Sequence, residues 1–532
     1  MLVIARTFTS TIRVLEALDC LRDDVRLRVR FCFDDTSAFH GGVAELLSRL
    51  ETPQVTWDEA VKAGHDLIIT ASENVDLTPF NAPVVVLPHG VGFQKLVPDS
   101  NGSGRRLSGV VPAASRDSAD VRPVVSHPDQ RERLRSISPR LAEHTTVVGD
   151  LAYDRARAGL RLRDRYRDAL GVAPGRRLVL LTSTWKDESA LGAHNDLPAR
   201  LLADLPFDGH RVAAVLHPNI WSEHSPWEVR RLYSAALEAG LLLIPPDDGW
   251  AAALAAADCV IGDHGSVTLY AAGLDRPLLL AAFGDEAVPG TAIARLAART
   301  GRLDVHAPLA PQIDRAIAGH VPGRHTEAVD QAFAYVDEAA PRFARMVYGL
   351  LGLEAPAAGP RTLAPGPPVP HHARRVTAFE VRSHIDADGG VHVARYPAAV
   401  RSVHEEPDGL RHLCAAESEP DSRFVENASV VHRDTAPGSA APAELRRLLD
   451  LYPGALLSAV PAEGGCDCLA RDGAAIRVRS APGVALPVLT GVVYTLLRTG
   501  RLTSGDVPLR LGGVPWEAAG VRVHVEVDPP PG

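Results

Sequence analysis

Two histidines follow predicted strands, at positions where their side chains could take part in acid–base chemistry. His89 follows an apolar run at 83–87, and His217 follows a second apolar run at 212–216. An imidazole ring titrates near neutral pH, so either side chain could accept or donate a proton at pH 7. Taken singly, His89 is explained equally well as a loop histidine bonded to backbone, and for His217 that structural explanation is favoured. For His217, a functional role is favoured once it is seen among the other polar residues at strand ends of the second half.

A polar turn at 262–266, with the sequence Gly-Asp-His-Gly-Ser, could bind an anion. It lies between the apolar run 259–261 and a helix that we expect to begin near Gly265. The first N–H groups of a helix lack partners within the helix and carry a partial positive charge, which suits a phosphate. The turn therefore predicts a phosphate site at a helix start.

Lysine is rare in this chain, which holds only Lys62, Lys95 and Lys186. Lys95 follows the His89 motif, and Lys186 follows the apolar run 178–181 in Thr184-Trp185-Lys186. Since lysine is a compact point-charge donor that arginine does not replace geometrically, both are candidates for contact with the anion.

Polar residues end four predicted strands of the second half, at Thr184, at His217, at 263–266 and at 285–286. The carboxyl ends of parallel strands meet at one edge of a sheet, so these residues are expected to line a single crevice.

The elements that must position these residues alternate between strand and helix. In the first half we expect strands at 2–5, 29–33, 66–70, 83–87 and 145–148, with helices at 10–21, capped by Ser10, and at 42–50. In the second half we expect strands at 178–181, 212–216, 241–244, 259–261 and 278–281, with a helix at 155–170 and another capped by Asp247 or Asp248. This pattern predicts an α/β fold with two Rossmann-type domains, 1–150 on the acceptor side and 151–354 on the nucleotide-donor side, facing a cleft. No GxGxxG follows the first strand, so a nicotinamide or flavin fingerprint is not supported.

The last third of the chain has a different pattern. A helix at 326–353, broken or kinked by Pro341, is expected to cross back to the first domain, and a Pro/Gly-rich linker follows at 355–375. Residues 376–532 predict an α+β domain of unknown role, with a hairpin at 376–395, strands at 475–479 and 521–527, and helices at 443–451 and 486–499. A zinc site from His404, His412, Cys414, Cys466 and Cys468 is the minority interpretation, because CxC alone is a weak signal. We therefore predict no metal.

Composition bears on the partners and the cellular location that we expect for this protein. The chain has 532 residues and a net charge of −9, which argues against a nucleic-acid partner. Cys32 and Cys259 lie in apolar runs, as expected for buried thiols in a reducing compartment. The first residues lack the features of a secretory signal, so a cytoplasmic location is expected, with a peripheral place at the inner face of the membrane left open.

Five blocks of sequence carry a resemblance to a known family. They are HGVGFQK at 89–95, a Gly-Asp to Asp segment at 149–154, STWK at 183–186, His-Pro at 217–218 and ADCVIGDHGSVTLYAAGLDRPLLL at 257–280. In this order they resemble the CDP-glycerol glycerophosphotransferase family, over roughly residues 1–350. The resemblance implies a GT-B-like fold, with His89 and His217 as the two functional histidines and the turn around Ser266 holding the donor pyrophosphate. The chain departs from the family pattern at Val91-Gly92, at 264–266 and at 284–286.

The expected function is that of a transferase. It would move a glycerophosphate-like or glycosyl group from a nucleotide-diphosphate donor, such as CDP-glycerol, to an acceptor hydroxyl in cell-envelope polymer biosynthesis. A membrane-associated acceptor is left open, and no cofactor is expected. His89 would take the acceptor proton, and His217 would polarise or protonate the leaving phosphate. The residues expected to bind the donor are Gly90, Lys95, Thr184, Trp185, Lys186, Pro218, Asp263, His264, Gly265 and Ser266.

Two alternatives remain open at this point. His-Pro-Asn at 217–219 and the Asp-x-Gly turn at 263–265 also resemble the hydrolysing UDP-N-acetylglucosamine 2-epimerases. A non-catalytic GT-B-like module, which keeps the fold and loses the chemistry, is the third interpretation.

Overall fold

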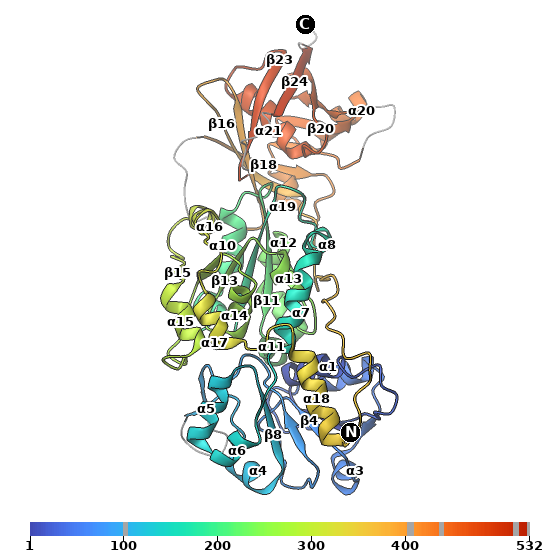
Figure 1. Cartoon of the computed structure of the whole chain (residues 1–532). Helices are drawn as coiled ribbons and strands as arrows, with labels where there is room; N and C mark the ends of the chain where they lie inside the picture. Colours follow the sequence, from blue (N-terminus) through green and yellow to red (C-terminus); the bar gives the residue numbers. More distant parts are fainter. Residues whose placement is uncertain (99–104, 402–408, 436–440, 514–520, 529–532) are drawn as a thin grey trace.

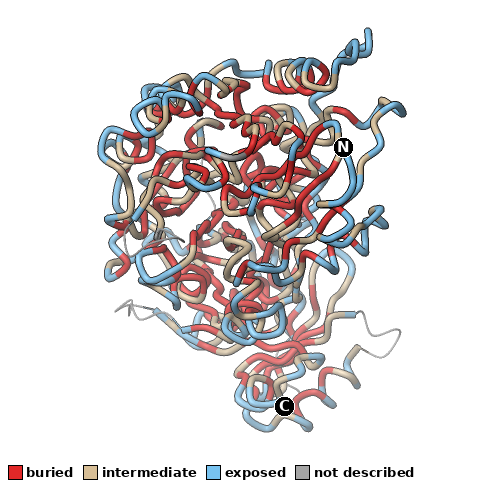
Figure 2. Tube along the Cα trace, turned by 90° about the horizontal axis from the view of Figure 1, so that it is seen from below, coloured by how far each residue is buried: buried red, intermediate tan, exposed pale blue. Residues whose placement is uncertain are grey.

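The chain forms three bodies that follow one another along a long axis, as Figure 1 shows. The structure is a computed structural model, and it describes residues 1–98, 105–401, 409–435, 441–513 and 521–528. Two α/β domains lie at the N-terminal end and in the middle, and a β-barrel domain lies at the other end. In the tube of Figure 2, buried segments gather in the interior and exposed segments lie on the outside.

The first sheet has seven parallel strands in the order 3-2-1-4-5-8-9. They are β3 (Gln54–Val55), β2 (Arg30–Phe33), β1 (Leu2–Ala5), β4 (Ile68–Thr70), β5 (Val84–Val86), β8 (Val121–Val125) and β9 (Thr146–Val147). In register, Val3 lies between Phe31 and Ile69. Such short buried strands read as continuous apolar runs because both faces of a parallel sheet are covered.

Helices cover both faces of this sheet. One face packs against α1 (Phe8–Leu18), α2 (Val43–Arg49) and α18 (Ala339–Leu351). The other packs against α3 (Trp57–Lys62), α5 (Pro128–Ile137) and α6 (Pro139–Glu143). The domain also contains α4 (Ala113–Ser118) and the antiparallel hairpin of β6 (Leu96–Pro98) and β7 (Arg105–Leu107).

The second sheet has six parallel strands in the order 12-11-10-13-14-15. They are β12 (Leu242–Ile244), β11 (His210–Leu216), β10 (Arg177–Ser183), β13 (Cys259–Gly262), β14 (Leu278–Leu280) and β15 (Gly301–Arg302). In both sheets the order reverses beside the first strand, at β1–β4 and at β10–β13, which is the Rossmann arrangement.

Two layers of helices enclose the second sheet. One layer contains α7 (Leu151–Gly159), α8 (Arg163–Ala169), α13 (Trp250–Ala256), α14 (Ser266–Gly273), α15 (Ala292–Arg299) and α17 (Thr326–Ala332). The other contains α9 (Ala190–Ala193), α10 (Leu197–Asp204), α11 (Pro218–Leu232), α12 (Ser234–Glu238) and α16 (Leu309–Ala318).

Several expected helix boundaries are wrong. Thr7, not Ser10, caps α1, and the two residues form a reciprocal capping box. The expected helix at 155–170 is α7 and α8, joined by a 3₁₀ turn η1 (Leu160–Leu162). Gly249, at φ 91°, precedes α13 in place of an aspartate cap, because the chain turns there through the left-handed region that glycine favours.

The expected helix at 326–353 is two helices. The break lies between α17 and α18, and Pro341 lies in the first turn of α18, where its missing N–H has no helical partner to lose. As expected, α18 returns to the first domain, where Phe343 and Val347 are buried in the same core as Val3 and Ile69. The yellow helix over the blue sheet in Figure 1 shows this return.

The segment after α18 lies along the second domain on its way to the barrel. The Tyr166 hydroxyl donates to the Pro365 carbonyl at 2.6 Å, and the His371 N–H donates to the Leu243 carbonyl at 2.7 Å. Residues 355–375, expected as a linker, are therefore bonded to the second domain at Pro365 and at His371.

The third body is a closed barrel of nine strands in the order 16-17-23-24-22-21-20-19-18. They are β16 (Ala378–Ile385), β17 (Val391–Pro397), β23 (Gly505–Leu511), β24 (Val521–Asp528), β22 (Ala475–Ser480), β21 (Gly465–Ala470), β20 (Leu457–Ala462), β19 (Val430–His432) and β18 (Leu410–Ala416). The predicted hairpin at 376–395 is confirmed as the antiparallel pair β16–β17.

The helix α21 (Leu486–Arg498) packs among the inward-facing residues of the barrel, and it is buried on every side from Pro487 to Leu496. A helix that is apolar all round belongs in a core. Two further helices, α19 (Ser422–Glu426) and α20 (Ala441–Leu451), pack on the outside. The predicted fold class is confirmed, with two Rossmann-type domains and a C-terminal domain of strands and helices. Within the described residues, none of the helices combines the length and apolar character of a membrane span.

Candidate functional site

A cavity of about 510 Å³ lies where the carboxyl edges of the two sheets face each other. Its walls include the loops after β1 and β4 in the first domain and after β10, β11 and β13 in the second. Ligands of open α/β sheets bind outside the carboxyl ends of the strands, at the point where the strand order reverses. The predicted catalytic and donor-binding residues all line this cavity, from both domains. Glu286 lines it too, whereas Asp285, which was also expected there, does not.

His89 is paired with a buried carboxylate. Its Nδ1 lies 3.5 Å from Oε2 of Glu73, and Arg106 lies 3.5 Å from the other oxygen of that carboxylate. Burial alone would raise the pKa of Glu73, and the neighbouring His89 and Arg106 outweigh burial and lower it to about 2. The carboxylate is therefore charged at neutral pH and favours a proton on Nδ1 of His89, which leaves the Nε2 lone pair free to accept one. Contacts of this kind are often long before substrate binds and tighten afterwards.

His217 is held as a neutral ring. Its Nδ1 accepts a hydrogen bond from the Asn219 N–H at 3.1 Å, at the start of α11. Burial, and after it the positive charge of Lys95, lowers the pKa of His217 to about 3. The proton of the neutral ring is therefore on Nε2, so at neutral pH His217 offers a hydrogen-bond donor. Of the two roles expected for it, polarising a phosphate oxygen fits this state, and donating a full proton as imidazolium does not.

The start of α14 touches the first domain. Ser266 Oγ accepts a hydrogen bond from the Val91 N–H at 3.1 Å, which joins the His89 loop to the helix. A Cβ atom on Gly90 would lie 2.7 Å from the same Oγ, so only glycine permits this approach. The start of α14 therefore lies directly beside the His89 loop.

Asp263 bonds to the backbone of the two loops beneath the cavity. Its Oδ2 accepts from the N–H groups of Thr184 and Ala190 at 2.8 and 2.9 Å, and its Oδ1 accepts from Gly265 N–H at 2.8 Å. The carboxylate is completely buried. Asp263 thus joins the loops after β10 and β13 beneath the cavity, because its oxygens accept hydrogen bonds from the backbone N–H groups of both loops.

Two lysines and a histidine surround one further carboxylate, Glu286. Lys95 and Lys186 lie 3.9 and 3.8 Å from it, and His264 Nε2 lies 3.7 Å from it. His264 Nδ1 accepts from the Gly284 N–H at 3.1 Å, which fixes the proton on Nε2. Lys186 also lies over the Trp185 ring, 4.5 Å from its centre, and that ring meets Phe39 of the first domain edge to face at 4.7 Å.

Two residues that sequence reasoning missed support the site. Glu73 lies three residues after β4. A carboxylate just past a predicted strand is the sequence signal that could have indicated it. Arg13 lies on α1, where no pattern marks it. Its Nε donates to the His89 carbonyl at 3.3 Å, and its guanidinium lies 5.2 Å from the centre of the Trp250 ring. It thereby joins α1, the His89 loop and α13.

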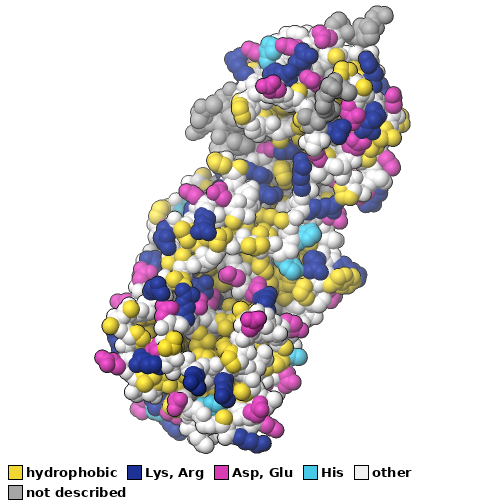
Figure 3. All heavy atoms as spheres, turned by 90° about the vertical axis from the view of Figure 1, so that its right-hand side faces the viewer, with side chains coloured by type: hydrophobic (Ala, Val, Ile, Leu, Met, Phe, Trp, Pro, Cys, Tyr) yellow, Lys and Arg dark blue, Asp and Glu magenta, His cyan; other side chains and the backbone are white. Residues whose placement is uncertain are grey.

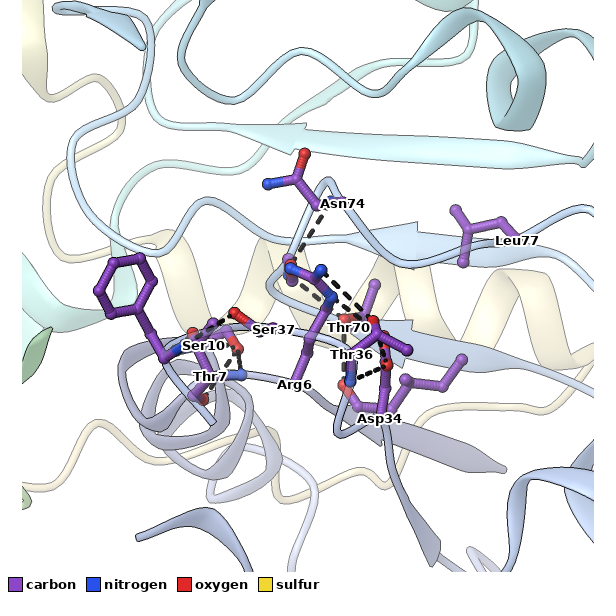
Figure 4. A network of polar contacts seen from close by, with 12 residues as sticks. Arg6, Thr7, Ser10, Asp34, Thr36, Ser37, Thr70, Asn74 and Leu77 are labelled. Atoms are coloured by element: carbon purple, nitrogen blue, oxygen red, sulfur yellow. Dashed lines mark hydrogen bonds and ion pairs between the residues drawn. The ribbon is translucent and has the colours of Figure 1, made fainter. Parts of the chain in front are cut away.

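Figure 4 shows a network of polar contacts in the first domain that reaches the cavity wall through Arg6, Ser37 and Asn74. Arg6, just past β1, lies between the turn after β2 and Asn74, and its Nε is 3.0 Å from Oδ2 of Asp34. Asp34 also accepts from the Thr36 hydroxyl at 2.6 Å. This part of the wall offers hydroxyl, amide and guanidinium groups.

The minority zinc interpretation gains no support. His404 lies outside the described residues. Among the described ones, no group of three or more His, Cys, Asp or Glu residues could hold a metal ion. Cys414, Cys466 and Cys468 are buried free thiols, as are Cys32 and Cys259.

On the face in Figure 3, basic and acidic side chains are interspersed.

No protein-family profile and no curated protein sequence matches the chain. Among solved structures it is similar to the wall teichoic acid polymerase TagF, with a TM-score of 0.41 and 13% identity over 66% of this chain and 88% of that one. It is similar to MnaA of S. aureus with UDP, at a TM-score of 0.40 and 13% identity over 67% and 98% of the chains. UDP-GlcNAc 2-epimerase from Neisseria meningitidis, bound to UDP-GlcNAc, gives a TM-score of 0.41 and 13% identity over 66% and 98%. At identities this low, the likeness concerns the fold, and the function is argued from the geometry of the site.

Proposed function

We propose that the chain is a transferase that moves a glycerophosphate-like or glycosyl group from a nucleotide-diphosphate donor to an acceptor hydroxyl. One observation carries this proposal. The His89–Glu73 pair of the first domain and the lysine, serine and helix start of the second domain line the same cavity. A base on one wall and an anion site on the other are the two parts that such a transfer needs.

The first domain supplies the base. Glu73 favours a proton on Nδ1 of His89, and the Nε2 lone pair takes the proton of the acceptor hydroxyl. The acceptor oxygen forms the new bond to the transferred group while the bond from that group to the nucleotide phosphate oxygen breaks. A positioned general base contributes about 10²- to 10⁴-fold in rate.

The second domain supplies most of the anion site, and the first domain adds Lys95. The start of α14 and the Ser266 hydroxyl would bind the donor phosphates, and Lys95 and Lys186 would neutralise the charge of the leaving nucleotide. His217 would donate its Nε2–H to a phosphate oxygen. Because donor and base lie on different domains, the reaction depends on their being held together across the cleft.

Nucleotide binding tests the proposal first. We expect CDP to raise the melting temperature of the protein in thermal-shift measurements with CDP, UDP and GDP. Stabilisation by UDP alone would favour a 2-epimerase instead. No stabilisation by any of the three would contradict both enzymatic interpretations.

Turnover tests it second. We expect His89→Ala to lower the rate of nucleotide release from CDP-glycerol, with a hydroxyl acceptor, by about 10²- to 10⁴-fold while CDP still stabilises the protein. His306→Ala, at an exposed histidine outside the cavity wall, is the matched control and should keep the wild-type rate. A near-normal rate for His89→Ala would remove His89 from the mechanism.

A further inference from the structure

The carboxylate of Glu286 lies among four groups that donate or carry positive charge, and it contacts all of them loosely. Lys95 and Arg105 lie 3.9 and 4.0 Å from its oxygens, and Lys186 and His264 lie 3.8 and 3.7 Å from them. A charged hydrogen bond is usually about 2.7–2.9 Å long. Each donor is therefore about an ångström further away than a direct bond would place it.

The groups around Glu286 come from both domains. Lys95 and Arg105 belong to the segment that follows His89, and Lys186 and His264 belong to the second domain. The backbone joins the domains at the same place, because the Leu96 N–H donates to the Glu286 carbonyl and the Val288 N–H donates to the Gln94 carbonyl, each at 2.9 Å. Glu286 thus lies on the line where the two domains meet.

The cluster holds more positive than negative charge. Three side-chain cations face the single carboxylate, whose pKa is held below its ordinary value first by the neighbouring His264. Asp263, a second carboxylate near Lys95, gives its oxygens to backbone N–H groups. A third, the exposed Glu188, lies beside Gly284. Burial lowers the pKa of Lys95, an effect that Glu286 opposes, so the ammonium lies in a poorly hydrated place where charge interactions are strong.

We propose that Glu286 is the resident counter-ion of a diphosphate site formed by Lys95, Lys186 and His264, and that a bound diphosphate displaces it. This inference rests on the proposed function, since it assigns the charged part of the donor to these groups. A diphosphate carries several charges and more acceptor oxygens than one carboxylate, so it can meet donors that Glu286 reaches only loosely. Before the donor binds, the carboxylate reduces the repulsion between the two lysine ammonium groups. Because it is negative, it also weakens the binding of an anion at the same place.

Removing the counter-ion should therefore strengthen the binding of a diphosphate. We expect Glu286→Gln to bind inorganic pyrophosphate about tenfold more tightly than the wild type in titration calorimetry, because a nearby like charge is removed. Asp285→Asn is the matched control. It removes the same charge one residue away, at an exposed side chain that is not among the described residues lining the cavity, and it should bind pyrophosphate as the wild type does.

The outcomes separate this inference from the proposed function. If Glu286→Gln remains folded and binds pyrophosphate no better than the wild type, or if neither binds it, the role of Glu286 is overturned, whatever CDP does. If pyrophosphate binding strengthens while no nucleoside diphosphate binds, the proposed function is overturned and the counter-ion role stands. An equal gain in Asp285→Asn would mean that net charge alone causes the effect, and would also overturn the inference.

Discussion

At the scale of single residues, three histidines with similar sequence positions offer different chemistry. Each ring is oriented through Nδ1, in His89 by a carboxylate and in His217 and His264 by a backbone N–H that donates to it. The first arrangement leaves a lone pair on Nε2, and the other two place a proton there. A ring nitrogen with a free lone pair therefore lies on one wall of the cavity and hydrogen-bond donors lie on the other, a distinction that the residue type alone does not carry.

A fourth histidine leads to a prediction about acid stability. His412 in the barrel is buried against the Tyr494 ring, with centroids 3.9 Å apart, and neither ring nitrogen has a hydrogen-bond partner among the described residues. Burial lowers the pKa of His412 to about 3. Between about pH 6.5 and 3, His412 binds a proton in the unfolded chain and stays neutral in the folded chain. This histidine therefore makes the free energy of unfolding fall as the pH falls.

We expect His412→Phe to raise the free energy of unfolding by about 1–3 kcal/mol at pH 7.5, because two unpaired buried nitrogens are removed. The gain should be larger at pH 4.5. Denaturant unfolding at both pH values, with His306→Phe as an exposed control, measures it. A gain that does not grow on acidification would show that His412 is not held neutral.

At the scale of elements, the cavity depends on two loops that approach each other very closely. The His89 loop meets the start of α14 through the bond from Val91 to Ser266, and Gly90 makes room for it. The segment at 94–96 adds backbone bonds to 286–288. The two walls are thus joined beside the groups that would do the chemistry.

We expect Gly90→Ala to destabilise this junction by about 1–3 kcal/mol, since its Cβ would lie 2.7 Å from Ser266 Oγ. Ser266 must then rotate, and the Val91 N–H loses its acceptor. Denaturant unfolding measures the loss. Gly64→Ala, where a Cβ meets no atom within 4 Å, should cost far less. If the two substitutions cost the same, the close approach is not what holds the loops.

How far the sequence predicts the molecule can be seen at this scale. The strands were predictable because buried parallel strands are continuous apolar runs, and their order brings Thr184, His217 and Ser266 to one cavity. Helix starts were less predictable, because a cap such as Gly249 depends on backbone angles more than on side-chain chemistry. Glu73 and Arg13 act through neighbours distant in sequence. Closure of the barrel depends on the pairs β17–β23 and β22–β24, which join strands far apart in the chain and leave no local pattern.

At the scale of the whole molecule, the barrel is fastened to the second domain. Arg395 makes two hydrogen bonds of 2.7 Å to the Asp208 carboxylate, and it lies 4.4 Å from the centre of the Phe379 ring. Its side chain is 8% exposed, and that of Asp208 is 16% exposed. The Phe207 N–H donates to the Arg395 carbonyl at 2.8 Å. This junction is buried and uses both backbone and charge.

We expect Arg395→Met to lower the melting temperature and to separate the unfolding of the barrel from that of the rest in calorimetry. Removing one partner of a buried pair costs about 3–5 kcal/mol, because the other charge is left without compensation. Arg477→Met breaks an exposed pair with Glu526 on the same barrel and should cost less than about 1 kcal/mol. A single unchanged transition in Arg395→Met would show that the ion pair does not couple the two bodies.

The return of α18 to the first sheet has a consequence for the order of synthesis. The strands of that sheet leave the ribosome within the first 150 residues, but the helix that covers one of its faces follows roughly 190 residues later. At about 5–20 residues per second, the part of that face which α1 and α2 leave open waits on the order of ten to forty seconds for Phe343 and Val347. During translation the first domain therefore exposes that apolar strip to chaperones. It can close only after the second domain has been made.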